Sequence, residues 1–148
     1  MSAPYLKPGL PQPLPAPDGL DAPFWAGLAA EEIRIQRCRA CRGWQWGPEW
    51  ICHHCLADDL SYEAVPGDGI IYSYERVWHP VHPALAEQGP YLIVLVALPQ
   101  AGGVRLVGNL LGDPHQPVVI GAPVSAVFEH HREAEPPFTL LQWTAASA

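Results

Sequence analysis

The chain of 148 residues is 49% hydrophobic and only 16% charged, so it can bury a core, and wholesale disorder is excluded. Its 8 basic residues are outnumbered by 15 acidic ones, which gives a formal net charge of -7. This balance argues against a nucleic-acid-binding protein, because such binding depends mainly on Lys and Arg side chains that neutralise phosphates. The longest apolar run, Tyr91–Leu98, is too short for a membrane span, which needs about 20 residues.

Prolines are concentrated at the start of the chain. The run Pro-Gln-Pro-Leu-Pro-Ala-Pro at positions 11–17 cannot form a helix. We therefore expect residues 1–20 to be an extended leader, which is either disordered or an arm that lies along a partner protein. This segment also lacks the long apolar stretch of a secretion signal, so the expected compartment is the cytoplasm, where cysteines stay reduced.

A short helix is expected within residues 21–32. Asp21 can cap its start, and Pro23 suits its first turn. Phe24, Trp25 and Leu28 then fall on one side of this helix. Because so short a helix is not stable alone, we expect these three side chains to dock against a partner.

Two Cys-x-x-Cys pairs form the strongest motif in the sequence. Cys38 and Cys41 make the first pair, and Cys52 and Cys55 make the second, ten residues further on. Each pair presents two thiolates from one tight turn, and two such turns complete the tetrahedron that zinc prefers. An iron centre with the same ligands and a pair of disulfides are the alternatives. His53 and His54 lie inside the second pair and are expected to be bystanders.

A zinc ion held by four thiolates has no open coordination position, so its expected role is structural. All four cysteines are then used by the metal, and no thiol remains as a nucleophile. The sequence also lacks a Gly-x-Ser-x-Gly elbow, a phosphate-binding Gly-x4-Gly-Lys loop and a His-Glu-x2-His motif. We therefore predict no catalytic residues in this chain.

The predicted fold is mostly β, with a zinc ribbon over residues 33–65, a barrel over 66–144 and a disordered tail over 145–148. Gly, Pro and Asp separate segments rich in β-branched and aromatic residues, which favours strands and, for the last five, a small closed barrel. The run Tyr91–Leu98 does not alternate, so it is expected to be central and buried on both faces. The predicted strands are Ile33–Arg37, Trp44–Trp46 and Leu60–Val65 in the ribbon, and Ile70–Trp78, Tyr91–Leu98, Val104–Leu111, Val124–Glu129 and Phe138–Trp143 in the barrel.

A single-stranded nucleic-acid-binding module is one alternative function. Four arginines surround the first cysteine pair, and three tryptophans follow it, a composition that resembles a basic and aromatic stacking surface. Three glutamates in the same stretch reduce its net charge to +1, and the barrel segment is acidic, so nucleic acid is not the expected partner. The residues concerned are Arg34, Arg37, Arg39, Arg42, Trp44, Trp46 and Trp50.

An ordered set of short motifs gives a more specific indication. Phe24-Trp25, the two cysteine pairs, Gly69-Ile70-Ile71-Tyr72-Ser73-Tyr74, His79-Pro80, His82-Pro83, Pro90-Tyr91 and Gly108-Asn109 follow one another along the chain. This set resembles the family of rubredoxin-like zinc ribbons joined to OB-fold barrels, long catalogued as domain of unknown function thirty-five. The resemblance covers about residues 21–143, and the Pro-rich leader lies outside it.

The resemblance implies a non-catalytic accessory subunit of acyl-CoA metabolism. Members associate with thiolase-superfamily proteins, including acyltransferases, thiolases and lipid-transfer-protein-like aldolases of steroid side-chain breakdown. Others are found with MaoC-like enoyl-CoA hydratases, which are the alternative partner class. The implied shared ligand is a coenzyme A thioester, which the OB-fold helps to hold while the partner does the chemistry.

Residue chemistry suggests candidates for a coenzyme A site. Guanidinium groups suit its phosphates, which points to Arg76 and Arg105. Tyr74 or Trp78 offers a flat surface for adenine, although both can equally be core or interface residues. Two histidines in the following loop, His79 and His82, are close enough in sequence to join such a site. They are also the candidate bases if the chain is a self-contained thioester enzyme.

Overall fold

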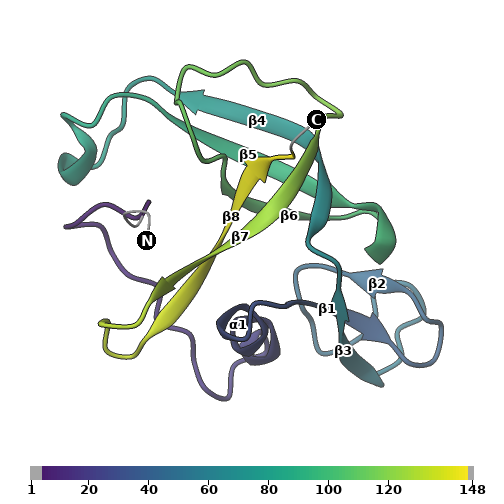
Figure 1. The fold of residues 1–148 in the computed structure, drawn as a ribbon. Coiled ribbons are helices and arrows are strands. Elements are labelled where there is room, and N and C mark those ends of the chain that lie inside the picture. Colours follow the sequence, from purple (N-terminus) through teal and green to yellow (C-terminus); the bar gives the residue numbers. More distant parts are fainter. Residues whose placement is uncertain (1–4, 147–148) are drawn as a thin grey trace.

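The computed structural model describes residues 5–146, and its chain forms a small ribbon domain beneath a barrel (Figure 1). Within residues 5–146, one α-helix, α1, spans Ala22–Ala29, and two short 3-10 helices span Pro83–Leu85 and Pro99–Ala101. Among the described residues, no helix is long and apolar enough to cross a membrane. The strands are β1 (Ile33–Cys38), β2 (Trp44–Gln45), β3 (Leu60–Val65), β4 (Asp68–Val77), β5 (Tyr91–Leu98), β6 (Val104–Asn109), β7 (Pro123–His131) and β8 (Phe138–Ala145).

The ribbon is a three-stranded antiparallel sheet in the order β2-β1-β3. Strand β1 pairs with β3 along its whole length, from Ile33 opposite Val65 to Cys38 opposite Leu60. Ile33 and Ile35 are buried, as expected for alternate positions on a strand with one covered face. Gln36 is also buried, at 2% exposure, although it follows Ile35 directly and lies on the opposite face. There its side chain bonds to Gln45 on β2 and to the backbone of Glu49, in the loop that leads to the second cysteine pair.

The barrel has the strand order β6-β5-β4-β7-β8, all antiparallel. Its two ends meet where Leu110 bridges Trp143 and the Leu111 N–H donates to the Trp143 carbonyl at 2.8 Å. The mostly β architecture, with a zinc ribbon before a nearly closed five-stranded barrel, is therefore confirmed. Closure gives the edge strands partners that an open sheet would leave unpaired.

Strand β5 corrects one expectation. It is central, because it pairs with both β4 and β6. Its alternate residues Leu92, Val94, Val96 and Leu98 are fully buried inside the barrel. The intervening residues are only half-buried, so the strand is not buried on both faces. An apolar outer face of β5 is thus left partly open to solvent.

Helix α1 packs inside the chain, against β1 of the ribbon and β8 of the barrel. Phe24 and Leu28 are 8% and 1% exposed, so this chain itself covers the two side chains expected to dock on a partner. Trp25 is half-buried, and its indole N–H donates to the Asp21 carboxylate at 2.9 Å. The helix therefore lies between the two domains, as Figure 1 shows, and of the three side chains expected to dock on a partner only Trp25 stays partly exposed.

The described part of the leader lies against the barrel of its own chain. The backbone N–H groups of Tyr5 and Leu6 donate to the carboxylate of Glu129 on β7, at 2.6 and 3.2 Å. Residues 1–4 lie outside the described part. At the other end β8 continues through Ala145, one residue into the expected tail, because Ala145 pairs with Val124 of β7. Residues 147–148 of that tail also lie outside the described residues.

Candidate metal centre and candidate ligand surfaces

The two cysteine pairs form turns of the same geometry. In the first turn, the Arg42 N–H donates to the Cys38 carbonyl at 3.0 Å, and in the second, the Leu56 N–H donates to the Cys52 carbonyl at 3.1 Å. Both closing residues are left-handed, with φ of 63° for Arg42 and 65° for Leu56. This conformation is uncommon for residues with a Cβ. The local sequence thus folds each pair into a compact turn whose two sulfurs, one buried and one exposed, are directed to the same side.

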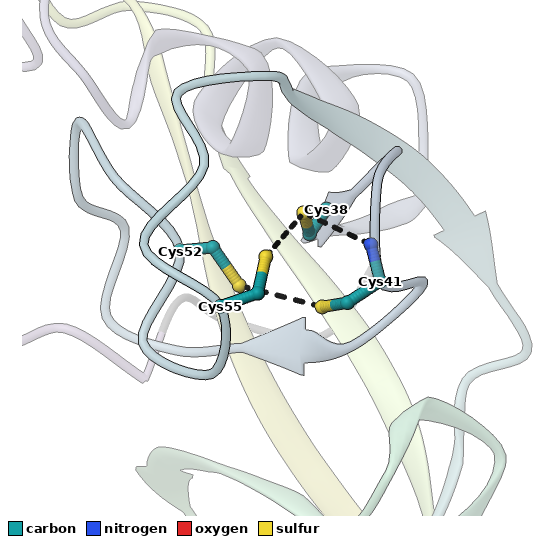
Figure 2. A group of neighbouring side chains, drawn as sticks. All are labelled: Cys38, Cys41, Cys52 and Cys55. Carbon is teal, nitrogen blue, oxygen red and sulfur yellow. Dashed lines mark hydrogen bonds between the residues drawn. The ribbon is translucent and has the colours of Figure 1, made fainter.

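The two turns bring all four sulfurs together (Figure 2), with every pair of sulfurs within 4.8 Å. The Sγ atoms of Cys38 and Cys55 are 3.7 Å apart, and those of Cys41 and Cys52 are 3.6 Å apart. These separations are far longer than the bond of about 2.0 Å in a disulfide. They match the roughly 3.8 Å between sulfurs around a tetrahedral ion with Zn–S bonds of about 2.3 Å. The donor set therefore fits zinc and excludes the disulfide alternative for this conformation.

Backbone N–H groups point at the sulfurs and stabilise their ionised form. The N–H of Cys41 donates to Cys38 Sγ at 3.5 Å, and that of His54 donates to Cys52 Sγ at 3.3 Å. Desolvation opposes ionisation of Cys52, but the N–H groups of Cys55 and His54 and the neighbouring thiols outweigh it and lower its pKa to about 6. The Gly43 N–H lowers the pKa of Cys41, but desolvation and the other thiols raise it to about 12. The pKa values of these two thiols are therefore shifted in opposite directions, with Cys52 favoured as a thiolate and Cys41 as a neutral thiol.

The two histidines of the second turn lie beside the sulfurs but outside the four-sulfur group. The His54 ring nitrogen Nε2 lies 3.0 Å from the Trp44 carbonyl. Its ring lies against Gly43, where an added Cβ would meet the His54 Cδ2 atom at 2.6 Å. The His53 N–H donates to Gln45. Both histidines thus hold the ribbon together, while four sulfurs make up the candidate ligand set.

Two buried glutamines, which sequence reasoning did not single out, hold the second turn against the sheet. The Gln45 amide donates to Gln36 Oε1 at 2.7 Å and accepts the His53 N–H at 2.9 Å. Gln36 in turn donates to the Glu49 carbonyl at 2.9 Å and accepts the Glu49 N–H at 3.0 Å. Gln45 also donates to the Ile51 carbonyl at 3.3 Å. In the sequence, the one indication of this role is that both glutamines lie within ten residues of a cysteine pair.

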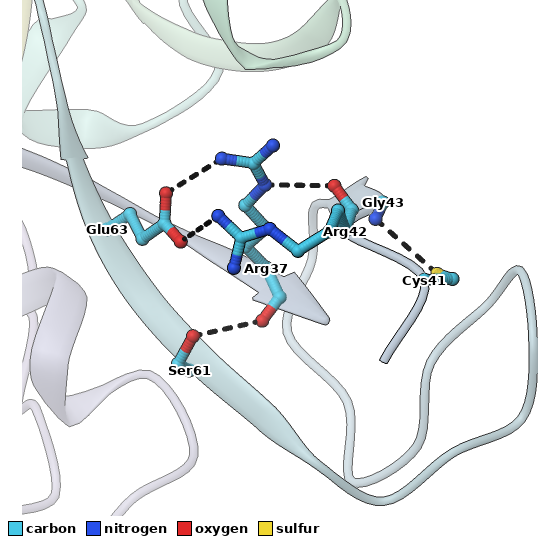
Figure 3. A network of polar contacts seen from close by, with 6 residues as sticks. All are labelled: Arg37, Cys41, Arg42, Gly43, Ser61 and Glu63. Atoms are coloured by element: carbon cyan, nitrogen blue, oxygen red, sulfur yellow. Dashed lines mark hydrogen bonds and ion pairs between the residues drawn. The ribbon is translucent and has the colours of Figure 1, made fainter. Parts of the chain in front are cut away.

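The arginines that resembled a basic patch are all engaged in ion pairs. Glu63 on β3 binds Arg37 and Arg42, each at 2.9 Å (Figure 3). The hydrogen bond from Arg37, desolvation and the bond from Arg42 together leave the Glu63 pKa lowered. The other two arginines, Arg34 and Arg39, pair with acidic residues at 2.8 and 3.1 Å. All four arginines are therefore paired with acidic residues, which leaves little net positive charge here for binding to nucleic acid.

The structure brings three of the coenzyme A candidates together. Tyr74 and Arg76 share a face of β4, and Trp78 follows the end of that strand. The Arg76 guanidinium lies 5.6 Å from the Trp78 ring and donates to the carbonyls of Pro114 and Gln116 at 2.9 and 2.5 Å. Trp78 stays exposed. Arg76 therefore ties a loop to the barrel and has fewer free donors than expected for a phosphate ligand.

The other three coenzyme A candidates lie in different parts of the barrel. Arg105 pairs with Ala97 on the outer face of the sheet, where its guanidinium lies 4.3 Å from the Tyr72 ring. His79 is exposed in the loop after β4. His82 Nδ1 accepts the Ala84 N–H at 3.2 Å and so caps a 3-10 helix. Since Nδ1 is an acceptor, the neutral His82 ring carries its proton on Nε2 and is a donor there rather than a base.

Comparison with known proteins agrees with this architecture. Residues 25–61 match the model of the ChsH2 rubredoxin-like zinc ribbon domain, and residues 62–129 match the model of the ChsH2 C-terminal OB-fold domain. The chain belongs to the ChsH2 zinc-ribbon and OB-fold family. The family models place the boundary between the two domains at residue 61, four residues before the expected end of the ribbon at 65.

Two curated relatives are longer than this chain. A probable enoyl-CoA hydratase alpha subunit of Thermomonospora curvata is 38% identical over 90% of this chain and 40% of its own length. A 3-oxo-4,17-pregnadiene-20-carboxyl-CoA hydratase alpha subunit of Mycobacterium tuberculosis is 32% identical over 71% of this chain and 32% of its own length. The chain thus spans less than half the length of these relatives.

Two solved structures are also similar. A chain of the structure described as Ltp2-ChsH2(DUF35) aldolase is 34% identical, with a TM-score of 0.75 over 90% of this chain and 100% of that one. A Sulfolobus solfataricus protein of unknown function from the DUF35 family is 18% identical, with a TM-score of 0.61 over 87% of both chains. The second likeness bears on the fold alone, and it agrees with the ribbon and barrel described above.

Proposed function

We propose that this chain is a non-catalytic accessory subunit of an acyl-CoA aldolase or hydratase complex. The supporting observation is its likeness, along nearly its whole length, to a chain of the Ltp2-ChsH2(DUF35) aldolase structure. The favoured partner is a thiolase-fold protein, such as a lipid-transfer-protein-like aldolase, an acyltransferase or a thiolase. The proposed setting is the breakdown of steroid or lipid side chains in the cytoplasm, where the thiol ligands stay reduced.

Zinc has a structural role in this proposal. Cys38, Cys41, Cys52 and Cys55 would hold the ion, and their thiolates would fill every coordination position. When bound, the ion cross-links two turns that have little core of their own, so metal binding contributes directly to folding. With the four thiols engaged, the proposed chemistry belongs to the partner.

The outer face of the barrel is the proposed partner surface. Ile70, Tyr72 and Val107 are 39%, 54% and 64% exposed there. Ile93 and Leu95 of β5 lie between them and are half-buried. An apolar sheet face of this kind is typical of a protein–protein contact. It would also explain why β5 is apolar at every position although the isolated chain buries only one of its faces.

Coenzyme A is the proposed shared ligand, held between this chain and its partner. Trp78 offers an exposed ring, and Arg105 lies on the proposed partner face. Tyr74, His79 and His82 stay candidates for contacts near the loop after β4. Direct contact can be tested by titrating coenzyme A into the assembled complex and comparing the wild type with Trp78→Ala and Arg105→Gln variants. Unchanged affinity in both variants would remove these residues from the site.

A hydratase partner is the second candidate. The two curated relatives are named as alpha subunits of CoA hydratases, which favours a MaoC-like partner. Co-expression of this chain with each partner class, followed by gel filtration and activity assays, would separate the two possibilities. The expected result is a stable complex with one class, and activity only in that complex. Acyl-CoA turnover by the isolated chain would contradict the proposal.

A matched pair of variants tests the partner surface. Val107→Asp introduces a charge on the outer face of the barrel, whereas Val81→Asp introduces one in the loop after β4, where Val81 is 99% exposed. Both variants should fold and retain zinc. We expect Val107→Asp to prevent co-purification with the partner and Val81→Asp to leave it unchanged. Equal recovery of the partner with both variants would exclude this face.

A further inference from the structure

A cavity of about 500 Å³ opens at the end of the barrel near the described leader. Its walls come from the leader, the loop between β4 and β5, and strand β8. Much of the surface is apolar, contributed by Leu6, Leu10, Leu85, Tyr91 and Leu140. Small-molecule sites commonly have volumes of roughly 300–1,000 Å³, apolar walls and a few polar groups. The cavity therefore has the size and lining of a ligand site.

The polar groups of the cavity favour a negative charge. Lys7, which is the single lysine of the chain, lies in the wall, and no Asp or Glu is among the described lining residues. His82 also lines the cavity, with its Nε2–H as a donor, since Nδ1 accepts the Ala84 N–H. The lining of this cavity thus has a positive formal charge, whereas the protein as a whole has a net charge of -7. A ligand with an anionic end would be attracted to this cavity.

A third polar group is deeper in the wall. Gln142 on β8 is 3% exposed, and its Oε1 accepts the Asn109 N–H at 2.7 Å. Within residues 5–146, no acceptor is bonded to its amide nitrogen. Because Gln142 lines the cavity, its amide N–H groups are available to a ligand oxygen. Buried amides usually have partners for their N–H groups, and in this cavity either water or a ligand oxygen can supply one.

The leader that carries Lys7 is fixed in place. Glu129, whose side chain is 10% exposed, accepts the N–H groups of Tyr5 and Leu6 and also contacts His131. His131 in turn stacks on Phe138, with ring centroids 4.5 Å apart. Two backbone hydrogen bonds to a charged acceptor are among the stronger anchors available to a loose segment. The leader is therefore a preformed wall of the cavity.

We propose that this cavity binds a compact apolar carboxylic acid in its ionised form. The Lys7 ammonium and the His82 Nε2–H receive the carboxylate, and the leucines contact the apolar body. This inference does not depend on the accessory role proposed above, because the proposed partner surface is on the outer face of the barrel, and of the cavity residues used here only His82 is also a coenzyme A candidate. The ligand class follows from one cation, neutral donors and apolar walls.

Isothermal titration of the zinc-loaded full chain with octanoate tests the proposal. Octanoate should bind saturably, whereas octanamide and octyltrimethylammonium should bind more weakly, because neither is an anion. Lys7→Gln should weaken octanoate binding by about tenfold, as expected for loss of a hydrogen bond to a charged group. Arg132→Gln, which removes an exposed cation from the turn between β7 and β8, is the matched control and should leave the affinity unchanged.

A second pair of variants tests the location. Leu85→Trp should fill the cavity and abolish octanoate binding, whereas Val81→Trp, in the same loop but fully exposed, should not. Equal affinity for octanoate and octanamide, no effect of Lys7→Gln, or no saturable binding would each overturn the proposal. Competitive displacement of octanoate by coenzyme A would also overturn it, because the cavity would then belong to the coenzyme A site.

Discussion

The buried glutamine pair of the ribbon predicts an unusually large effect for a single polar substitution. In Gln45→Leu, the His53 N–H and the Ile51 carbonyl lose their partner, and Gln36 loses one of its two donors. An orphaned buried polar group costs about 1–3 kcal/mol. The His53 and Ile51 groups are only part-buried, so each should cost near the lower end of that range, and the buried bond to Gln36 is lost as well. Because Leu is similar in size to Gln, we expect the free energy of unfolding to fall by about 2–4 kcal/mol in total. That is a large part of the roughly 5–15 kcal/mol available to a small protein.

Urea unfolding of the zinc-loaded protein measures this loss, and competition with a chromogenic chelator measures zinc affinity. Since zinc binding and ribbon folding are coupled, affinity should fall by about 30-fold to several hundred-fold. Gln100→Leu is the matched control, because Gln100 also donates twice to backbone carbonyls, each at 2.8 Å, but is exposed. Water can replace those bonds, so its cost should be small. Equal losses in the two variants would refute the reasoning.

Three further predictions concern the metal, the helix and one tyrosine. Cys38→Ser should lose zinc and unfold the ribbon, whereas His53→Ala should retain zinc, as measured by metal analysis. A folded, zinc-loaded Cys38→Ser protein would contradict the ligand assignment. Leu28→Ala should lower the free energy of unfolding by about 2–5 kcal/mol, because Leu28 is 1% exposed, and a loss below about 1 kcal/mol would argue against its position. Burial, with a smaller effect of Asp21, raises the pKa of Tyr62 from 10.0 to about 12. The neutral Tyr62 phenol should therefore stabilise the folded protein fully below pH 10, and this contribution should be lost as pH rises through 12. In an ultraviolet titration of tyrosine ionisation, Tyr62→Phe should remove the step near pH 12.

Local patterns were sufficient for much of the fold. The spacing of the cysteine pairs predicted two equivalent turns, since only two residues separate the thiols in each. Strands β3 and β5 have the predicted bounds, Leu60–Val65 and Tyr91–Leu98, because turn residues border both segments. Strand β4 begins at Asp68 rather than Ile70, since Asp68 and Gly69 pair with β7 through their backbones. Such backbone pairing depends on a partner strand more than 50 residues away.

The features that the sequence did not reveal share a cause, because the burial and pairing of a side chain depend on segments far away in the chain. The apolar run of β5 does not reveal that only one face is covered within this chain. The net charge of their stretch correctly argued against a nucleic-acid surface at the four arginines, but their ion pairs were not predictable, because Glu63 and Asp59, which pair with three of them, come about 20 residues later. The aromatic helix indicated a partner, but the ribbon and the barrel of the same chain cover most of it. For the same reason, the role of Glu129 in fixing the leader was not predictable from the sequence.

The most direct test of the accessory role is a tagged pull-down from the native host, with the co-eluting proteins identified and quantified by mass spectrometry. The wild-type chain should recover a thiolase-fold or MaoC-like protein in near-equal amount, and Val107→Asp should lose that protein while Val81→Asp keeps it. Recovery of neither partner class by a folded, zinc-loaded wild-type chain would contradict the account.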